Sequence, residues 1–264
     1  MDVIGQITAG GLLDGWGLLI IFVGSFLAGF VDAIAGGGGL ISVPAFLFAG
    51  VPIHFTIGTN KLASAMGTAL ATFKYMRKGF MLAKLCVPCV IVALVASSIG
   101  ANVSMLTSEN ALRVVMLIII PLAGFYVLKK KDLGQHERLE NFAKTLALCL
   151  VVSLVVGFYD GFYGPGTGTF LMLLLTGAAH LSLDHAAGVT KCVNLTTNVS
   201  ALCVFALGGT CLFALGFVAG CFNLLGSYFG SSQYTEKGAA IARPIMLVVL
   251  VVFAVKLIAE LLGF

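Results

Sequence analysis

A ten-residue motif occurs twice in the chain, and its two copies lie almost half a chain length apart. The first copy begins at Gly29 and the second at Gly157, 128 residues later. Each copy places an aspartate, Asp32 or Asp160, and a glycine-rich break inside strongly apolar sequence. Both features are energetically costly there. A costly feature repeated at this interval predicts a membrane protein with two pseudosymmetric halves and a site between them.

The composition indicates an integral membrane protein. Of the 264 residues, 59% are hydrophobic and only 10% are charged, with a mean hydropathy of +1.08. Soluble domains carry about 25% charged residues. Long apolar segments without the alternation of an outer-membrane β-barrel predict helical spans. The net charge of +4 comes mainly from loops between these segments, so it indicates membrane topology and not nucleic-acid binding.

Ten apolar segments follow one another, five in each half. The first half contains 16–34, 40–50, 57–76, 85–104 and 111–128. The second half contains 145–162, 168–179, 186–207, 212–232 and 241–262. Segments 40–50 and 168–179 are too short to span a bilayer as straight helices. Because both follow the glycine-rich break, they indicate the binding site of a transporter.

The repeat continues beyond the motif. After a two-residue insertion the offset becomes 130, which aligns Gly58 with Gly188, Lys61 with Lys191, Gly79 with Gly209, Ser97 with Ser227, Gly100 with Gly230, Arg113 with Arg243 and Met116 with Met246. The sequence therefore predicts a first membrane repeat over 1–128, a linker over 129–144 and a second repeat over 145–264.

The distribution of Lys and Arg predicts how the halves are oriented. Basic residues flank the turn near 79–84 and the linker 129–144, which places both on the cytoplasmic side. The equivalent turn of the second half, 208–211, carries no charge. Equivalent turns lie on opposite sides of the membrane only if each half crosses it an odd number of times. We therefore expect an inverted five-plus-five arrangement with short, broken helices. The alternative is eight spans with 40–50 and 168–179 re-entrant.

Two lysines and two aspartates are the candidate charged groups of the site. Lys61 and Lys191 are placed on the first turns of long apolar helices. A lysine in hydrocarbon faces a cavity or a partner. Each could bind an anion, pair with the aspartate of its own half, or extend to the interface. Asp32 and Asp160 could couple protons, release a partner on substrate binding, or simply cap a helix end.

The glycine-rich breaks are candidate anion sites. Gly37, Gly38 and Gly39 precede one short segment, and Gly166, Thr167 and Gly168 precede the other. A helix that begins at such a break presents free N–H groups and the positive end of its dipole. The alternative is that the glycines only allow close helix packing.

Polar side chains accompany both lysines at helical spacing: Asn60, Ser64, Thr68, Asn194, Thr197 and Asn198. This spacing places them on one face of each helix. We expect that face to line a cavity, with Asn60 and Asn194 in contact with substrate. The alternative role is contact between helices.

The seven cysteines suggest a second class of function. Cys86 and Cys89 have the C-x-x-C spacing of a redox or metal site, although no second pair and no histidine cluster accompany them. Packing within an apolar helix is the alternative. We expect neither a metal nor a cofactor.

The paired motifs, with Thr59-Asn60-Lys61 and the segment 190–194 downstream, resemble the TauE/SafE family of membrane permeases, also called the sulfite exporter or TSUP family. The resemblance covers nearly the whole chain. It implies an inner-membrane permease for sulfur-containing anions such as sulfite, sulfonates or sulfoacetate.

These patterns favour a secondary transporter that is not an enzyme and works by alternating access, with a small sulfur oxyanion and membrane lipid as its partners. An anion channel, or a membrane thiol-redox protein that uses Cys86 and Cys89, is the alternative. The sequence leaves open the substrate, the direction, the coupling ion and the oligomeric state, for which a homodimer is one alternative.

Overall fold

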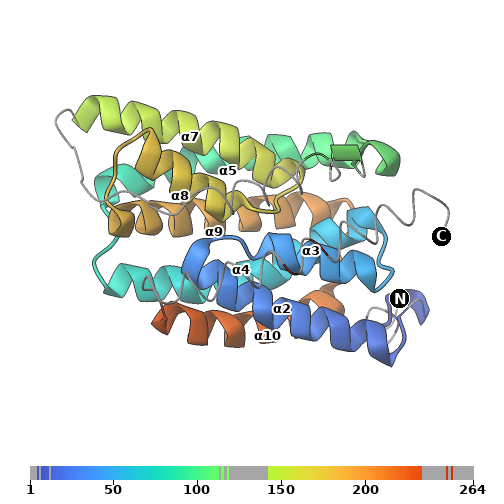
Figure 1. Cartoon of the computed structure of the whole chain (residues 1–264). Coiled ribbons are helices and arrows are strands. Elements are labelled where there is room, and N and C mark those ends of the chain that lie inside the picture. Colours follow the sequence, from blue (N-terminus) through green and yellow to red (C-terminus); the bar gives the residue numbers. More distant parts are fainter. Residues whose placement is uncertain are drawn as a thin grey trace.

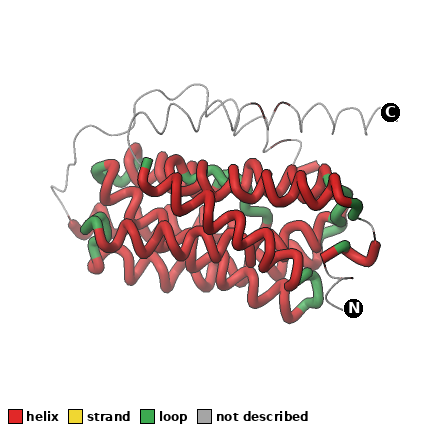
Figure 2. The backbone as a smooth tube through the Cα atoms, turned by 90° about the horizontal axis from the view of Figure 1, so that it is seen from below, coloured by secondary structure: helices red, strands yellow, loops and turns green. Residues whose placement is uncertain are grey.

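The protein is a bundle of helices that run along one common axis (Figures 1 and 2). The computed structural model describes residues 5, 7–11, 13–112, 114, 115, 118, 142–233, 248 and 251. Within these residues the elements are η1 (Ala9–Gly11), α2 (Gly15–Ala35), α3 (Gly39–Phe48), α4 (Ile53–Arg77), α5 (Ala83–Leu106), α7 (Phe142–Phe162), α8 (Thr167–Gly177), α9 (Leu183–Leu207) and α10 (Phe213–Ser232).

The predicted all-α membrane fold is confirmed. Eight of the ten predicted segments correspond one to one to these helices. Five described helices are long and apolar enough to cross a membrane: α2, α5, α7, α9 and α10. The predicted segments 111–128 and 241–262 and most of the linker 129–144 lie outside the described residues, so the division into repeats at these boundaries stays a prediction.

Helix boundaries follow from local chemistry. The Asp14 side chain accepts a hydrogen bond from the Gly17 amide and caps α2, which ends at Gly36 in the left-handed conformation that glycine favours. Ser182 caps α9 in the same way. The prediction was wrong about where α4 starts: the helix begins at Ile53, after Pro52, so Lys61 lies two turns inside it and not on its first turns.

α3 folds back along α2. Gly38 lies against Ala28, whereas further along α3 Ala45 touches Gly24, and Ala49 lies beside Gly17. The chain therefore returns to the end of the bundle where α2 begins, which we call the Gly15 end. From there α4 runs to the opposite end, the Arg77 end, whereas α3, with 10 residues, covers only about 15 Å of the bundle length.

Corresponding helices of the two halves run in opposite directions. Along α4, Gly58 lies against Phe205 of α9, and the Thr72 hydroxyl donates to the Lys191 carbonyl of α9. Because contacts early in α4 meet residues late in α9, the two helices are antiparallel. Figure 1 shows the same reversal between α2 and α7, whose first residues lie at opposite ends of the bundle. This direction agrees with the predicted inverted arrangement.

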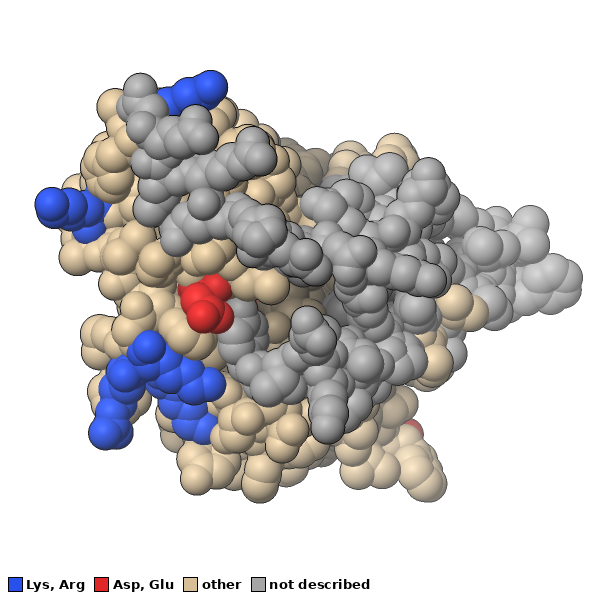
Figure 3. Space-filling model, turned by 60° about the vertical axis from the view of Figure 1, so that its left-hand side comes forward, with Lys and Arg blue, Asp and Glu red and all other residues tan. Residues whose placement is uncertain are grey.

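Exposed basic side chains gather at one end. The residues are Arg77, Lys78, Lys84 and Lys144, at the ends of α4, α5 and α7. Figure 3 shows Lys and Arg side chains projecting from this region of the surface. The Arg77 end is therefore positively charged, whereas the described charged side chains of the Gly15 end are acidic, Asp14 and Glu109.

The two glycine-rich breaks touch each other at the centre of the bundle. Gly36 has φ +76°, and a Cβ on it would lie 2.5 Å from the Gly168 carbonyl carbon. A Cβ on Gly168 would lie 2.3 Å from the Gly36 oxygen. Real Cβ atoms do not approach backbone this closely, so only glycine allows the contact. The breaks thus pack against each other, and close packing is one role of these two glycines.

We predict that Gly168→Ala destabilises the fold because its methyl group collides with rigid backbone of the other half. Overpacking of this kind costs about 1–3 kcal/mol. Thermal unfolding in detergent measures the loss. The control is Gly15→Ala, since a Cβ on Gly15 meets nothing within 4 Å. Equal unfolding temperatures for Gly168→Ala and the wild type would contradict the close contact.

Candidate functional site

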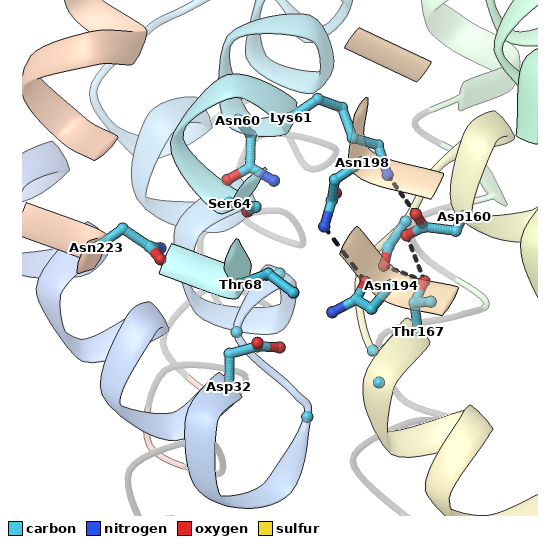
Figure 4. Close-up of a pocket in the computed structure, with 16 residues that line it drawn as sticks. Asp32, Asn60, Lys61, Ser64, Thr68, Asp160, Thr167, Asn194, Asn198 and Asn223 are labelled. Atoms are coloured by element: carbon cyan, nitrogen blue, oxygen red, sulfur yellow. Dashed lines mark hydrogen bonds and ion pairs between the residues drawn. The ribbon is translucent and has the colours of Figure 1, made fainter. Parts of the chain in front are cut away.

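A polar cavity lies between the two breaks (Figure 4). It is bounded by the α2–α3 break, α4, the α7–α8 break, α9 and α10. Its lining residues are Asp32, Gly36, Gly38, Gly39, Asn60, Lys61, Ser64, Thr68, Asp160, Gly164, Gly166, Thr167, Gly168, Asn194, Asn198 and Asn223. The cavity is therefore built from both halves, as the repeat predicts.

Two ion pairs join the halves at this cavity. Lys61 of the first half lies 2.8 Å from Asp160 of the second, and Lys191 of the second half lies 2.8 Å from Asp32 of the first. The side chains of both lysines are only 3% exposed. Pairing within one half and extension to the interface were therefore wrong interpretations. The repeat could reveal the four residues but not which partner each one takes.

The pairs lie at different depths along the bundle axis. Lys61 is eight residues from the start of α4 at the Gly15 end, and Lys191 is eight residues from the start of α9 at the Arg77 end. At 1.5 Å per residue, each lysine lies about 12 Å from its own end of the bundle. The cavity thus has one ion pair toward each end.

The aspartates have unequal surroundings. Asp160 faces Lys61, and it also accepts a hydrogen bond from the Thr167 hydroxyl at 2.5 Å. Its side chain is 3% exposed. Asp32 accepts from Lys191 at 2.8 Å and is 15% exposed, and the Lys191 ammonium also donates to the Asp32 carbonyl oxygen. The second copy of the motif therefore encloses its carboxylate more completely than the first.

Asparagine and hydroxyl side chains form the remaining wall. Asn60 is 6% exposed, and its Oδ1 has no hydrogen-bond partner among the described residues. Asn198 donates to Asn194. Because a buried polar atom without a partner is costly, the Asn60 amide is suited to a ligand in the cavity. Both asparagines predicted to contact substrate, Asn60 and Asn194, face the cavity.

Three predicted positions are placed differently from the rest. Gly37 is not part of the cavity lining, and Thr197 instead donates to the Asn194 carbonyl. Lys191 reaches the site through Asp32 and does not line the cavity directly. The repeat could not reveal Asn223, because its equivalent in the first half is Ala93. The available sequence signal for Asn223 was a single amide side chain within an apolar segment.

The cavity is small. The space open to the centre of a water molecule is about 20 Å³, which corresponds to about one water. A sulfur oxyanion is larger than water, so it needs the surrounding helices to separate. The side chains nearest to such a movement are those of the two ion pairs.

The C-x-x-C cysteines pack inside an apolar cluster. Cys86 and Cys89 share it with Cys149 of α7, and Cys192 of α9 packs against it. All four are free thiols, and Cys86 and Cys89 are buried. Reactive thiols lie at partly exposed, electropositive positions. The pair therefore has the surroundings of helix-packing residues.

The fold and the site together define a polytopic helical membrane protein with a charged polar cavity between two helix breaks. The chain belongs to the family described as Sulfite exporter TauE/SafE, whose sequence model matches residues 21–257. The predicted resemblance is thereby confirmed.

Relatives of the chain carry transporter names. It is 37% identical over 246 residues to the probable membrane transporter protein ORF9 of a Sinorhizobium species, covering 92% of this chain and 93% of the relative. It is 33% identical over 241 residues to the probable membrane transporter protein YfcA of Escherichia coli K12, covering 91% and 89%. A probable membrane transporter protein of Haemophilus influenzae is 33% identical over 243 residues, covering 92% and 95%. No solved structure matches the chain significantly. The protein is thus a multi-pass membrane transporter.

We predict that Lys61→Met destabilises the protein strongly, because it leaves the buried Asp160 carboxylate without its cation. Breaking a buried pair from one side costs about 3–5 kcal/mol. The double variant Lys61→Met/Asp160→Asn removes both charges and should recover part of the loss. Denaturant unfolding in detergent compares the two, with the exposed Lys84→Met as control. A double variant less stable than Lys61→Met would contradict the pairing.

Proposed function

We propose that this transporter is a secondary carrier of small sulfur-containing anions, such as sulfite, sulfonates or sulfoacetate, across the inner membrane. The observation that carries the proposal is the pair of cross-half ion pairs on either side of a polar cavity between two helix breaks. The names of these relatives specify no substrate, so the sulfur anion rests on the family description and on the chemistry of the site.

The cavity has the donors that an oxyanion needs. In the first turns of α3 and α8 the Leu40, Ile41 and Thr167 amides donate to carbonyls of the preceding break, so the Gly39 and Gly168 amides are the candidate backbone donors. The helix dipole makes these ends attractive to negative charge. Lys61 adds a charged side-chain donor at the second break. Asn60 also lines the cavity, and its NH₂ group is a further donor that could face an anion. These groups are the proposed binding residues, with Gly38, Gly39, Gly166 and Gly168 contributing backbone.

The two ion pairs are suited to act as gates. An anion that approaches Lys61 competes with Asp160 for the ammonium group and loosens the contact toward the Gly15 end. An anion near Lys191 competes with Asp32 in the same way toward the Arg77 end. Because each pair joins the two halves, breaking one pair lets the halves separate on that side only. Opening them in turn gives alternating access to one central site.

We further propose that the halves are related by a pseudo-two-fold axis in the plane of the membrane. Opposite directions of α4 and α9 and the paired breaks support this relation. Four exposed basic side chains lie at the Arg77 end: Arg77, Lys78, Lys84 and Lys144. They favour a cytoplasmic location for that end and for the linker 129–144. The repeats 1–128 and 145–264 then form the two moving bodies.

Exchange in proteoliposomes tests the proposal. We predict that purified protein exchanges labelled anion for unlabelled anion from a panel of sulfite, thiosulfate, methanesulfonate and sulfoacetate. Lys191→Met should reduce the exchange rate to background, because the Asp32 carboxylate then remains at the site without its cation. The matched control Lys84→Met removes an exposed lysine near the start of α5 and should leave the rate unchanged.

Three results would contradict this proposal. Absence of exchange for every anion of the panel would remove sulfur anions as the substrate class. Net anion flow without accelerated exchange would identify a channel in place of a carrier. Full exchange by a folded Lys191→Met variant would show that the Lys191–Asp32 ion pair is not required for transport.

A further inference from the structure

We infer that the protein takes up one proton with each monovalent anion that it binds, and that Asp32 is the carboxylate that accepts this proton. The inference rests on the proposed anion transport. It names a second substrate, the proton, and assigns it to one residue of the motif that occurs twice.

The charge balance of the cavity supports a co-bound proton. Among the described residues around the cavity the charged groups are Lys61, Asp160, Asp32 and the Lys191 that pairs with Asp32. Two positive and two negative charges leave the empty site neutral. A monovalent anion alone would leave one uncompensated negative charge in a buried, weakly polarisable region, which is strongly unfavourable. An anion that binds together with a proton keeps the site neutral.

The surroundings of the two aspartates identify which one accepts the proton. The Asp160 carboxylate pairs with the Lys61 ammonium, accepts a hydrogen bond from the Thr167 hydroxyl and is only 3% exposed, so water reaches it less readily than it reaches Asp32. The position equivalent to Thr167 in the first motif is Gly39, which has no hydroxyl to donate. The Asp32 carboxylate therefore has a single side-chain donor, Lys191, and at 15% exposure it can be reached by water in the cavity.

Lys191 can remain in place when Asp32 becomes neutral. Its ammonium donates both to the Asp32 carboxylate and to the Asp32 backbone oxygen. Protonation of the carboxylate removes the first acceptor but leaves the second. The ammonium then keeps its position and turns a freed N–H toward the anion. No covalent bond other than the O–H bond of Asp32 forms, and the proton returns to water when the anion leaves.

Few other ionisable groups face Asp32. From α9 the facing group is Lys191, and from α4 it is Tyr75, whose hydroxyl donates to the neighbouring Ala33 carbonyl. α3 and α8 contain no charged or titratable residue. In α10, Cys221 and Tyr228 are exposed on the outer surface. Protonation of Asp32 therefore acts mainly on one partner, Lys191.

Proton uptake by the wild-type protein is the first test, because it requires no variant to fold. Methanesulfonate is a suitable probe since it is monovalent and takes no proton itself near neutral pH. Titration calorimetry in two buffers with different ionisation enthalpies gives the number of protons bound with the anion. We expect about one proton per anion from the neutrality of the site. Binding or exchange without proton uptake overturns the inference but leaves the proposed anion transport intact.

Gradient-driven uptake in proteoliposomes tests the assignment to Asp32. An inward proton gradient should accumulate methanesulfonate in vesicles that contain the wild-type protein. Asp32→Asn should lose this accumulation, and whatever exchange it retains should become independent of pH. Asp160→Asn removes one gate pair and should lower the overall rate, but whatever uptake a folded Asp160→Asn variant retains should still increase with the proton gradient. The exposed carboxylate variant Glu109→Gln is the matched control and should behave as the wild type.

Each remaining outcome decides the inference. Gradient-driven accumulation that persists in Asp32→Asn overturns the assignment. Loss of accumulation in a folded Asp160→Asn, together with its retention in Asp32→Asn, overturns it as well. Absence of both binding and exchange for the whole panel in the wild type contradicts the proposed function, and the inference with it.

Discussion

The cost of burying charge in an apolar interior is the constraint on which the rest of this structure depends. Four charged side chains, Asp32, Lys61, Asp160 and Lys191, lie deep among helices that are otherwise apolar. An unpaired charge would be strongly destabilising at any of these positions, so each needs an opposite charge in direct contact. A buried ion pair stabilises little compared with apolar packing. Retaining two such pairs therefore indicates a function that needs breakable polar contacts.

The helix breaks are what bring these charges together. Each break ends one helix near the centre of the bundle and starts a short helix that returns to the end from which the chain came. Gly36 and Gly168 allow the two breaks to touch backbone to backbone. Because this contact leaves no room for side chains, the carboxylates that precede the breaks project toward the long helices α4 and α9, where the lysines lie. Close backbone packing and ion pairing thus support each other.

Much of the fold and part of the site could be predicted from the sequence. Apolar segment length gave the helices, the repeated motif gave both breaks with Asp32 and Asp160, and the longer repeat gave Lys61 and Lys191. The pattern could not give the start of α4, because the residues directly after Pro52 form helix without forming an unbroken apolar run. It could not give Asn223 either, since that side chain has no equivalent in the other half. The clustering of Cys192 with Cys86 was equally hidden, because cysteines far apart in the chain carry no mark of their neighbours.

The sequence by itself determined that this protein is a helical membrane protein, and it predicted two related halves with a charged site at the breaks, because hydropathy and repetition are properties of the linear chain. Only the tertiary structure decided that Lys61 pairs with Asp160 and Lys191 with Asp32. Pairing within one half and pairing across halves are equally compatible with the same spacing. The difference arises because antiparallel packing of α4 and α9 places each lysine beside the break of the other half, so that every pair connects the two bodies.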